Sequence, residues 1–245
     1  KESEGKAKIA DLDSIVDAAI SALGKKDMKG VKVLVTAGPT RSYLDPVRYL
    51  TNSSSGRMGI ALASEAISRG SEVTLILGPT PLSPPRCRAL YTETTEEMMA
   101  AVLGELKSSS YDLLVMAAAP LDFAFAKKRM EKISSDAALN VSLTPLPKVV
   151  KEARKAAPGL FIIGFKAEHK ITSEELEKRA VERLSASGMD MIIANDLSQP
   201  GAGFGSETNE VIIIPQGGKR THLPKMPKRS VARAIFDQYL ARRRK

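Results

Sequence analysis

The sequence has few of the side chains that support a disulfide, a metal cage or covalent catalysis. Its 245 residues include one cysteine, Cys87, and two histidines, His169 and His222. One cysteine cannot form an internal disulfide, and these three residues lack the spacing of a zinc site. There is also no Ser-His-Asp set and no activated cysteine. Cys87 lies in a proline-rich segment, where packing is favoured over catalysis.

Long apolar runs are also missing. No run approaches the roughly 18 residues of a membrane span, and the first residues lack a signal-peptide pattern. We therefore expect a cytoplasmic protein without a membrane partner.

Aromatic residues make up only 4% of the chain, although the formal net charge is +9. A basic nucleic-acid-binding module is one alternative that this charge allows. The scarcity of aromatics and the lack of a recognition motif argue against it. A small ligand with several phosphates would need the same positive field, so we expect no nucleic-acid partner.

Strand-length apolar runs alternate with segments of helical spacing over most of the chain. This alternation predicts an α/β fold: a doubly wound, mainly parallel, Rossmann-like sheet with helices on both faces. Thr94 and Glu97 form a capping-box pair that predicts a helix start, and Gly188 predicts a helix end. The expected strands are residues 32–36, 72–77, 88–91, 113–116, 160–164, 191–192 and 211–214.

Two regions are expected along the chain. Residues 1–30 read as a helical tail, with apolar residues at helical spacing before Gly24. Residues 31–245 form the main domain. In such a fold, ligands bind at the carboxyl ends of the strands, so the loops there are the candidate site.

The loop over residues 37–59 predicts a phosphate site. It holds Gly38, Thr40 and the run 52–56, in which hydroxyl groups and backbone N–H groups meet a helix N-terminus. These residues could equally be a simple turn and cap. A nicotinamide-dependent reductase is a further alternative, but the loop has no G-x-G-x-x-G, and the second strand ends in residues 78–80 without an acid.

Two other loops add to this prediction. Residues 118–139 place Asp122 before a basic stretch that includes Lys132, which is typical of a cationic flap over an anionic ligand or of a solvated loop. Residues 195–209 are glycine-rich and carry amides, which suits contact with a flat base or a backbone. These residues predict binding of a phosphorylated ligand, but they do not name the reaction.

Taken together, residues 35–41, 45–49 and 52–59 closely resemble the opening of phosphopantothenoylcysteine synthetases. The resemblance covers the chain from about residue 31 to the end. It continues through residues 116–119, Asp122, 131–133, 164–168, 194–196, 203–206 and 223–225.

The resemblance implies a ligase of coenzyme A biosynthesis that joins 4′-phosphopantothenate to L-cysteine. Prokaryotic members use CTP and Mg²⁺, form an acyl-cytidylate and release pyrophosphate, so CTP is favoured over ATP. Mg²⁺ is expected to bind mainly through the triphosphate, and no residue is assigned to it. The resemblance also implies a homodimer whose sites draw on both subunits, and an upstream FMN-dependent decarboxylase whose end the tail resembles.

Individual roles follow from the same resemblance. Arg48 and Asn52 match residues that hold the phosphopantothenoyl group, and the Asn52 amide can donate to the acyl oxygen as charge develops there. Lys132 matches a flap lysine that acts when the acyl-nucleotide forms. The expected nucleotide-binding residues are Gly38, Thr40, Met116, Ala117, Ala118, Asp122, Lys132, Thr144, Pro145, Leu146, Pro147, Phe165, Arg183 and Ser187.

The chain departs from the family pattern at a few positions. Ser134 stands where a second flap lysine is common, and residues 144–147 replace a usual Asn-Pro pair. Arg183 and Ser187 replace two lysines that contact the triphosphate, and Ser187 carries no charge. An inactive homologue is therefore a further alternative, against which the intact Asn52 and Lys132 argue.

Overall fold

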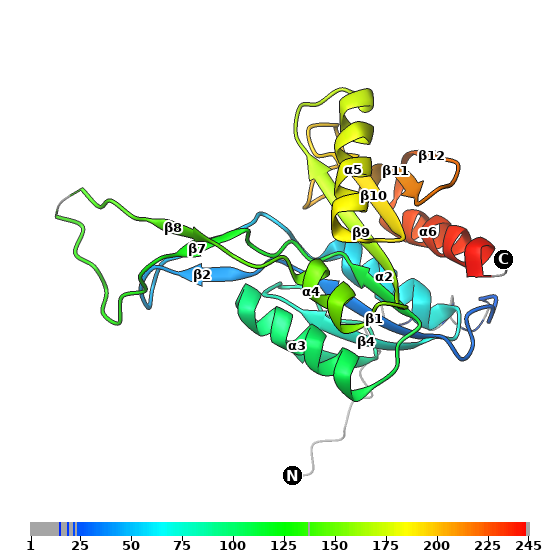
Figure 1. Ribbon diagram of the computed structural model, residues 1–245, viewed down its shortest axis with the longest axis horizontal. Coiled ribbons are helices and arrows are strands. Elements are labelled where there is room, and N and C mark those ends of the chain that lie inside the picture. The colour runs from blue at the N-terminus through cyan, green and yellow to red at the C-terminus, as the bar shows by residue number, and fades with distance from the viewer. Residues whose placement is uncertain (1–14, 16–18, 20–21, 23, 137, 244–245) are drawn as a thin grey trace, which may run out of the picture.

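The computed structural model describes residues 15, 19, 22, 24–136 and 138–243. Its centre is an eight-stranded sheet with the order β12-β11-β10-β9-β6-β1-β4-β5 (Figure 1). The strands are β1 (Lys32–Ala37), β4 (Glu72–Leu77), β5 (Arg88–Tyr91), β6 (Leu113–Met116), β9 (Phe161–Glu168), β10 (Met191–Asp196), β11 (Thr208–Pro215) and β12 (Thr221–Pro227). The predicted doubly wound sheet is confirmed.

Six strands of the sheet, from β10 to β5 in its order, run parallel to one another. β11 then pairs antiparallel with β10, and β12 pairs antiparallel with β11. The parallel strands β1, β4, β6 and β10 are almost entirely buried, which explains their largely apolar sequences, whereas the edge strand β5 is exposed or half-buried. The sequence predicted β11 but missed β12, because β12 is an edge strand with exposed polar residues and prolines.

Helices cover both faces of the sheet. On one face, α2 packs over β1 and β4, and α6 packs beside α2 and over β11 and β12; the buried residues of these two helices include Leu62, Ala66, Val231 and Phe236. On the other face, α3, α4 and α5 form a second apolar cluster with the sheet. The helices are α2 (Arg57–Ser68), α3 (Thr95–Ser108), α4 (Val149–Ala156), α5 (Ser173–Ser187) and α6 (Lys228–Arg243).

Local sequence signals explain where two of these helices begin and end. Thr94 caps α3 by accepting from the N–H of Glu97, and the Glu97 carboxylate accepts from the N–H of Thr94, so the predicted capping box is confirmed. Thr172 caps α5 by accepting from the N–H of Glu175 (3.3 Å). Gly188 ends α5 in the left-handed region, with a φ of 62°, as its position predicted.

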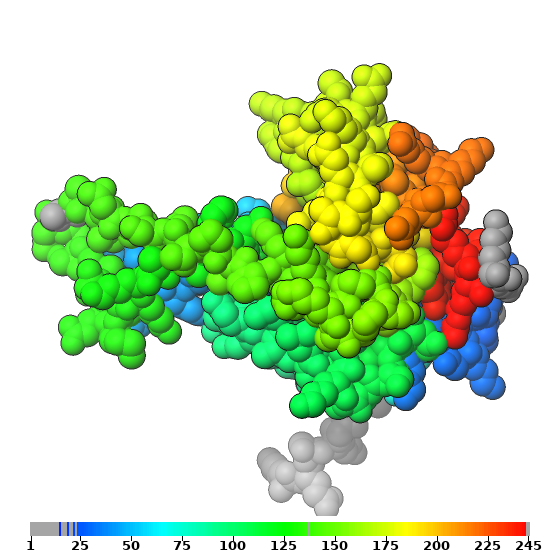
Figure 2. Space-filling model, in the orientation of Figure 1, coloured from blue at the N-terminus to red at the C-terminus, as the bar shows by residue number. Residues whose placement is uncertain are grey.

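A two-ribbon arm projects from the carboxyl edge of the sheet. We define the arm as residues 41–51 and 122–145. It contains the hairpin β2 (Arg41–Tyr43) and β3 (Tyr49–Thr51) and the ribbon β7 (Phe123–Phe125) and β8 (Leu143–Pro145). It extends far to the left of the body (Figures 1 and 2). Hydrogen bonds from Phe125 N to Ser42 Oγ (2.9 Å) and from Arg129 N to Leu44 O (2.8 Å) join its two parts.

The predicted N-terminal tail lies mostly outside the described residues. Ile15, Ala19 and Ala22, which are described, are helical. Met28 falls within the region predicted as tail, yet its side chain is fully buried in the core beside Val31. In the described part of the chain, no helix is both long and apolar enough to cross a bilayer.

Candidate functional site

The loops that follow β1 and β4 meet backbone to backbone. Gly38 has a φ of +81°, and a Cβ on Gly78 would lie 1.9 Å from the carbonyl oxygen of Pro39. Gly78 N also donates to Ala37 O (2.9 Å). There is therefore no room for a side chain at Gly78. A nicotinamide-dependent reductase would usually have an acidic residue near this position, at the end of the second strand, to bind a ribose.

The N-terminus of α2 lies directly above the end of β1. Its N-cap is Gly56, with a φ of 79°, and neither a capping side chain nor an acidic residue occupies its first turn. A Cβ on Gly59 would lie 2.4 Å from the Cβ of Ala37, so the first turn touches the strand. Ser54 Oγ and Ser55 Oγ accept from Gly56 N (3.4 Å) and Arg57 N (3.5 Å), which is the local contact that the cap alternative predicts. These bonds are long, and the first turn of α2 is also suited to an anion.

Asn52 joins this turn to the segment after β6. Its Nδ2 donates to Ala119 O (3.0 Å) and to Pro120 O (3.2 Å). Ala119 N in turn donates to Gly38 O (2.9 Å), and Ala118 N donates to Thr36 Oγ1 (3.2 Å). The predicted residues Gly38, Asn52 and Ala118 are thus brought together at the carboxyl edge of the sheet.

Thr40 is completely buried at the start of the arm. Its Oγ1 lies 2.7 Å from Thr95 Oγ1 and accepts from Leu121 N (2.8 Å). The hydroxyl that was predicted to contact a nucleotide is therefore committed to bonds within the protein, where it joins the arm to α3.

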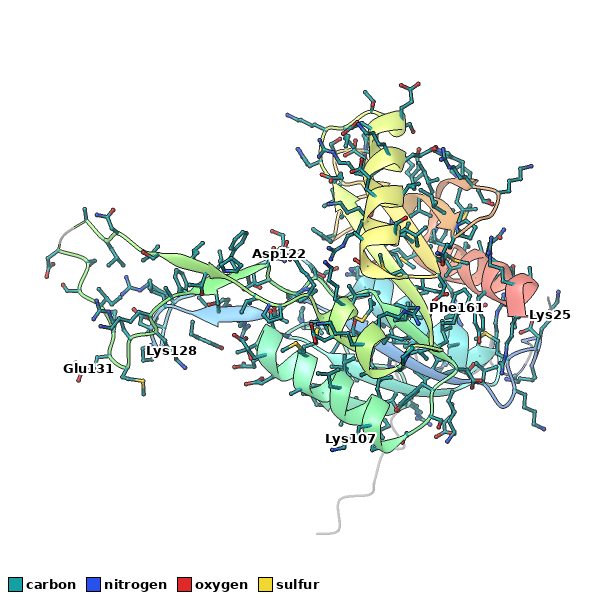
Figure 3. The ribbon with its side chains drawn as sticks, in the orientation of Figure 1. Lys25, Lys107, Asp122, Lys128, Glu131 and Phe161 are labelled. Atoms are coloured by element: carbon teal, nitrogen blue, oxygen red, sulfur yellow. The ribbon has the colours of Figure 1, made fainter. Side chains whose placement is uncertain are left out.

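The expected base-binding residues converge between β6, β9 and the base of the arm. Met116 ends β6 and pairs with Gly164 of β9, and half-buried Phe165 is the next residue on β9. Asp122 lies at the base of the arm (Figure 3), where its carboxylate pairs with Lys148 and its carbonyl oxygen accepts from Leu146 N (2.9 Å). These contacts gather the predicted residues Met116, Ala117, Ala118, Asp122, Thr144, Pro145, Leu146, Pro147 and Phe165.

Asp45 connects the hairpin of the arm to the segment that carries Lys132. Its fully buried carboxylate accepts from Arg48 Nε (2.9 Å), from the N–H groups of Val47 and Arg48 and from Ile133 N (3.2 Å). Arg48 Nη2 also donates to Ile133 O (2.6 Å). The hydrogen bond from Arg48 holds the pKa of Asp45 well below its ordinary value. Sequence reasoning assigned no role to Asp45, because the contact with Ile133 spans 88 residues.

The three predicted catalytic residues come from two parts of the chain. Arg48 precedes the three-residue strand β3 and Asn52 follows it. At about 3.3 Å per residue, an extended chain separates their Cα atoms by roughly 13 Å. Lys132 is exposed, and its neighbour Glu131 lies near the far end of the arm, whereas Asp122 lies at the base (Figure 3). Arg48 and Lys132 thus belong to the arm, while Asn52 belongs to the body.

Arg183 and Ser187 lie in the last turns of α5, which lead to the start of β10. Because β10 starts beside Ile163 near the beginning of β9, these residues are at the amino edge of the sheet, away from the other predicted residues. Ser187 is buried, and its hydroxyl has no hydrogen-bond partner among the described residues. The structure does not bring this pair to the site that the carboxyl edge forms.

The glycine-rich loop after β10 lies against the N-terminus of α2. Ser55 Oγ donates to Phe204 O, and Arg57 forms an ion pair with Glu207 (2.5 Å between Nη1 and Oε1). At the end of β10, Asp196 accepts from Ser198 N (2.9 Å) and Lys170 N (3.0 Å). The backbone hydrogen bond from Ser198 is the main reason that the pKa of Asp196 is lowered to about 2. A folded loop therefore forms one wall of the site.

Cys87 lies outside these contacts. Its thiol is partly buried, and burial raises its pKa, so the reactive thiolate is disfavoured. This agrees with the prediction that Cys87 packs and does not react.

The fold and these contacts define an α/β domain in which a helix N-terminus, that of α2, lies at the carboxyl edge of a mainly parallel sheet. Residues 28–242 match the family model described as DNA/pantothenate metabolism flavoprotein C-terminal domain. The match covers most of the chain, and the chain belongs to this family.

Known relatives agree with this membership. The chain is 43% identical over 235 residues to the coenzyme A biosynthesis bifunctional protein CoaBC of Thermococcus kodakarensis, covering 96% of this chain and 57% of that protein. It is 34% identical over 245 residues to CoaBC of Bacillus subtilis, covering 97% of this chain and 58% of that protein. The chain thus spans less than two thirds of the length of these curated relatives.

A solved structure agrees with the fold of the whole domain. The crystal structure of the C-terminal domain of coenzyme A biosynthesis bifunctional protein CoaBC has a TM-score of 0.74 and 30% identity. It covers 89% of this chain and 97% of that one.

Proposed function

We propose that the chain joins 4′-phosphopantothenate to L-cysteine, with a nucleoside triphosphate as the activating substrate. The observation that supports this best is Asn52, whose amide lies against residues 119–120, next to the open N-terminus of α2. This arrangement suits a ligand that presents both a phosphate and an acyl group. The names of the relatives, which are coenzyme A biosynthesis proteins, agree with it.

The proposed reaction has two steps. A carboxylate oxygen of 4′-phosphopantothenate attacks the α-phosphorus of CTP, and the bond to the β-phosphate breaks, which gives an acyl-cytidylate and pyrophosphate. The amine of cysteine then attacks the acyl carbon, loses a proton, and CMP leaves. In the first step, the ammonium of Lys132 would stabilise charge on the phosphate, and the Asn52 amide would donate to the acyl oxygen.

The second substrate is proposed to be CTP, bound with Mg²⁺. The base would lie against residues 116–118 and Phe165, where backbone groups can read its edge. Mg²⁺ prefers oxygen ligands, which the triphosphate supplies, and the nearby carboxylate of Asp122 is already paired with Lys148. We propose that FMN binds to the remaining part of the bifunctional relatives, which this chain does not cover.

We also propose that the active form is a homodimer in which the arm of one subunit completes the site of the other. Within one chain Arg48 is bound to Asp45 and Ile133 in the arm, whereas Asn52 is bound to Ala119 in the body, so the arm and the body present separate parts of a site. The arm also exposes large apolar side chains, which is typical of an interaction surface. They are Val47 (60% exposed), Tyr49, Phe123, Met130 (83% exposed), Leu139, Val141 and Leu143.

One incubation series tests the proposed reaction. The protein is mixed with 4′-phosphopantothenate, Mg²⁺ and one triphosphate at a time, with and without cysteine, and pyrophosphate and product mass are followed. We expect CTP to support cysteine-dependent product formation, and Asn52→Ala to abolish it. If no triphosphate releases pyrophosphate, the synthetase proposal is rejected. Retention on DNA at low salt tests the nucleic-acid alternative, and we expect it to be weak.

A further inference from the structure

Lys228, the first residue of α6, holds a loop through an enclosed ammonium group. The residue is only 6% exposed. Its Nζ donates to the carbonyl oxygens of Gly203 (3.3 Å), Phe204 (3.2 Å) and Ser206 (2.5 Å). Its backbone N–H donates to Glu207 O (3.0 Å). Four hydrogen bonds thus join one residue to the loop 203–207, and three of them depend on the side chain.

The same loop also contacts residues at the start of α2. The carbonyl of Phe204 accepts from both Lys228 Nζ and Ser55 Oγ, and Glu207 pairs with Arg57. Ser55 and Arg57 flank Gly56, the N-cap of the helix proposed to bind phosphate. A displacement of the loop would therefore also move Ser55, whose own carbonyl is fixed by Thr80 Oγ1 (2.8 Å).

We propose that Lys228 is a positioning residue for nucleotide binding, because it fixes the loop 203–207 against the N-terminus of α2. This inference rests on the proposed function and deepens it. The ligand is the triphosphate-bearing substrate, which Lys228 serves without touching it. The ammonium has three N–H donors, and the three carbonyl oxygens use them all, so a group with fewer donors cannot replace it.

The charge state of Lys228 gives the inference a pH dependence. Burial, and then repulsion by Arg57, lower the pKa of Lys228 to about 8, while Glu207 opposes this shift. Arg57 comes from α2 and Glu207 from the loop, so both elements that pack against the ammonium contribute a charge. Above pH 8 the amine loses a donor and its lone pair faces a carbonyl oxygen, so the loop should be held less tightly.

The test compares Lys228→Ala and Lys228→Gln with the control Lys225→Met. Lys225 is exposed on β12 beside the same loop, next to Gly201, and donates to none of the three carbonyl groups. The CTP Kd is measured by calorimetry without cysteine, and the KM for CTP and for cysteine by pyrophosphate release. We expect a CTP Kd and KM about tenfold higher or more in both Lys228 variants, since bonds from a charged donor are lost. The KM for cysteine and all constants of Lys225→Met should stay unchanged.

Chemical rescue separates positioning from a general loss of stability. In Lys228→Ala, propylammonium should restore the CTP Kd, because it supplies the three donors and fills the space of the side chain. Tetramethylammonium, which has no N–H group, should not. The CTP Kd of the wild type should also rise above pH 8, and that of Lys228→Gln should not. If Lys228→Ala does not fold, the CTP Kd of Lys228→Gln and the pH dependence of the wild-type Kd still test whether Lys228 positions the loop.

The two proposals can fail separately. If the wild type turns over CTP while both Lys228 variants bind it with unchanged Kd, the role of Lys228 is rejected and the synthetase proposal stands. Equal rescue by propylammonium and tetramethylammonium also rejects it. If the wild type binds CTP but releases no pyrophosphate, the synthetase proposal is rejected, and the CTP Kd values still decide the role of Lys228.

Discussion

The contact between Gly59 and Ala37 allows a quantitative prediction for Gly59→Ala. The added Cβ would lie 2.4 Å from Ala37 Cβ, 2.9 Å from Ala37 Cα and 3.0 Å from Thr36 O. Ordinary contact between two such carbon atoms is about 3.5–4 Å, so α2 has to move away from β1 by about 1 Å or more. Two of the three contacts are with backbone atoms of a central strand, so the strand cannot yield easily.

The expected loss of stability is about 1–3 kcal/mol, which is the usual range for overpacking a filled core. For a domain of this size, each kcal/mol corresponds to about 2–4 °C, so the Tm should fall by roughly 2–12 °C. The same movement displaces the first turn of α2. A misplacement of about 1 Å can reduce catalysis about 100-fold, so kcat/KM for CTP should fall by between tenfold and 100-fold.

Gly104→Ala is the matched control. Gly104 also lies inside a helix, α3, and an added Cβ there meets nothing within 4 Å. Replacing a helical glycine by alanine stabilises by about 0.5–1 kcal/mol, so its Tm should rise slightly and its kinetics should not change. Calorimetry and the pyrophosphate assay measure both variants. If Gly59→Ala has the Tm and kcat/KM of the wild type, α2 is not fixed against β1 and the argument from close contact is wrong.

Three further predictions concern other parts of the molecule. Because the pKa of Asp45 is lowered in the folded state, the ionised carboxylate stabilises the fold at neutral pH, and this stabilisation is lost as the pH falls below about 4, the ordinary pKa of an aspartate. The Tm of Asp45→Asn should therefore fall less steeply below pH 4 than the Tm of the wild type. Trypsin should also cut the arm of this variant faster near Lys132. Lys132→Ala should slow pyrophosphate release more than the reaction of preformed acyl-cytidylate with cysteine; equal slowing of both would contradict a role in the first step. Ser187→Ala removes a buried hydroxyl without a partner among the described residues, so it should raise the stability by about 1 kcal/mol in a denaturant titration.

The sequence predicted the body of the fold well because burial there leaves a direct pattern. β4, β5 and β6 have the predicted bounds, and the capping box of α3 is present. The arm and β12 were not predicted as strands. Most of their residues are exposed or only half-buried, and β7 is held by a hydrogen bond from Phe125 N to Ser42 Oγ, which lies 83 residues away. Hydrophobic patterns do not record such bonds.

Part of the candidate site was also predictable from the sequence. The loop order placed Gly38, Asn52 and residues 116–118 together, since parallel strands end at the same edge. Asp45 and Lys228 were missed as organising residues, because their roles depend on carbonyl and N–H groups that only the folded backbone brings near. Arg183 and Ser187 were predicted by resemblance alone, and α5 carries them to the other edge of the sheet.

The division of the predicted catalytic residues between the arm and the body predicts how much activity a mixture of two inactive variants would have. It carries Arg48 and Lys132, while the body carries Asn52. In a symmetric dimer with exchanged arms, a chain altered at Lys132 and a chain altered at Asn52 would each be inactive alone. Mixed dimers would hold one site with both defects and one site with none. After random exchange of subunits, about a quarter of the wild-type activity should therefore return, and a mixture that stays inactive would mean that each chain uses its own arm.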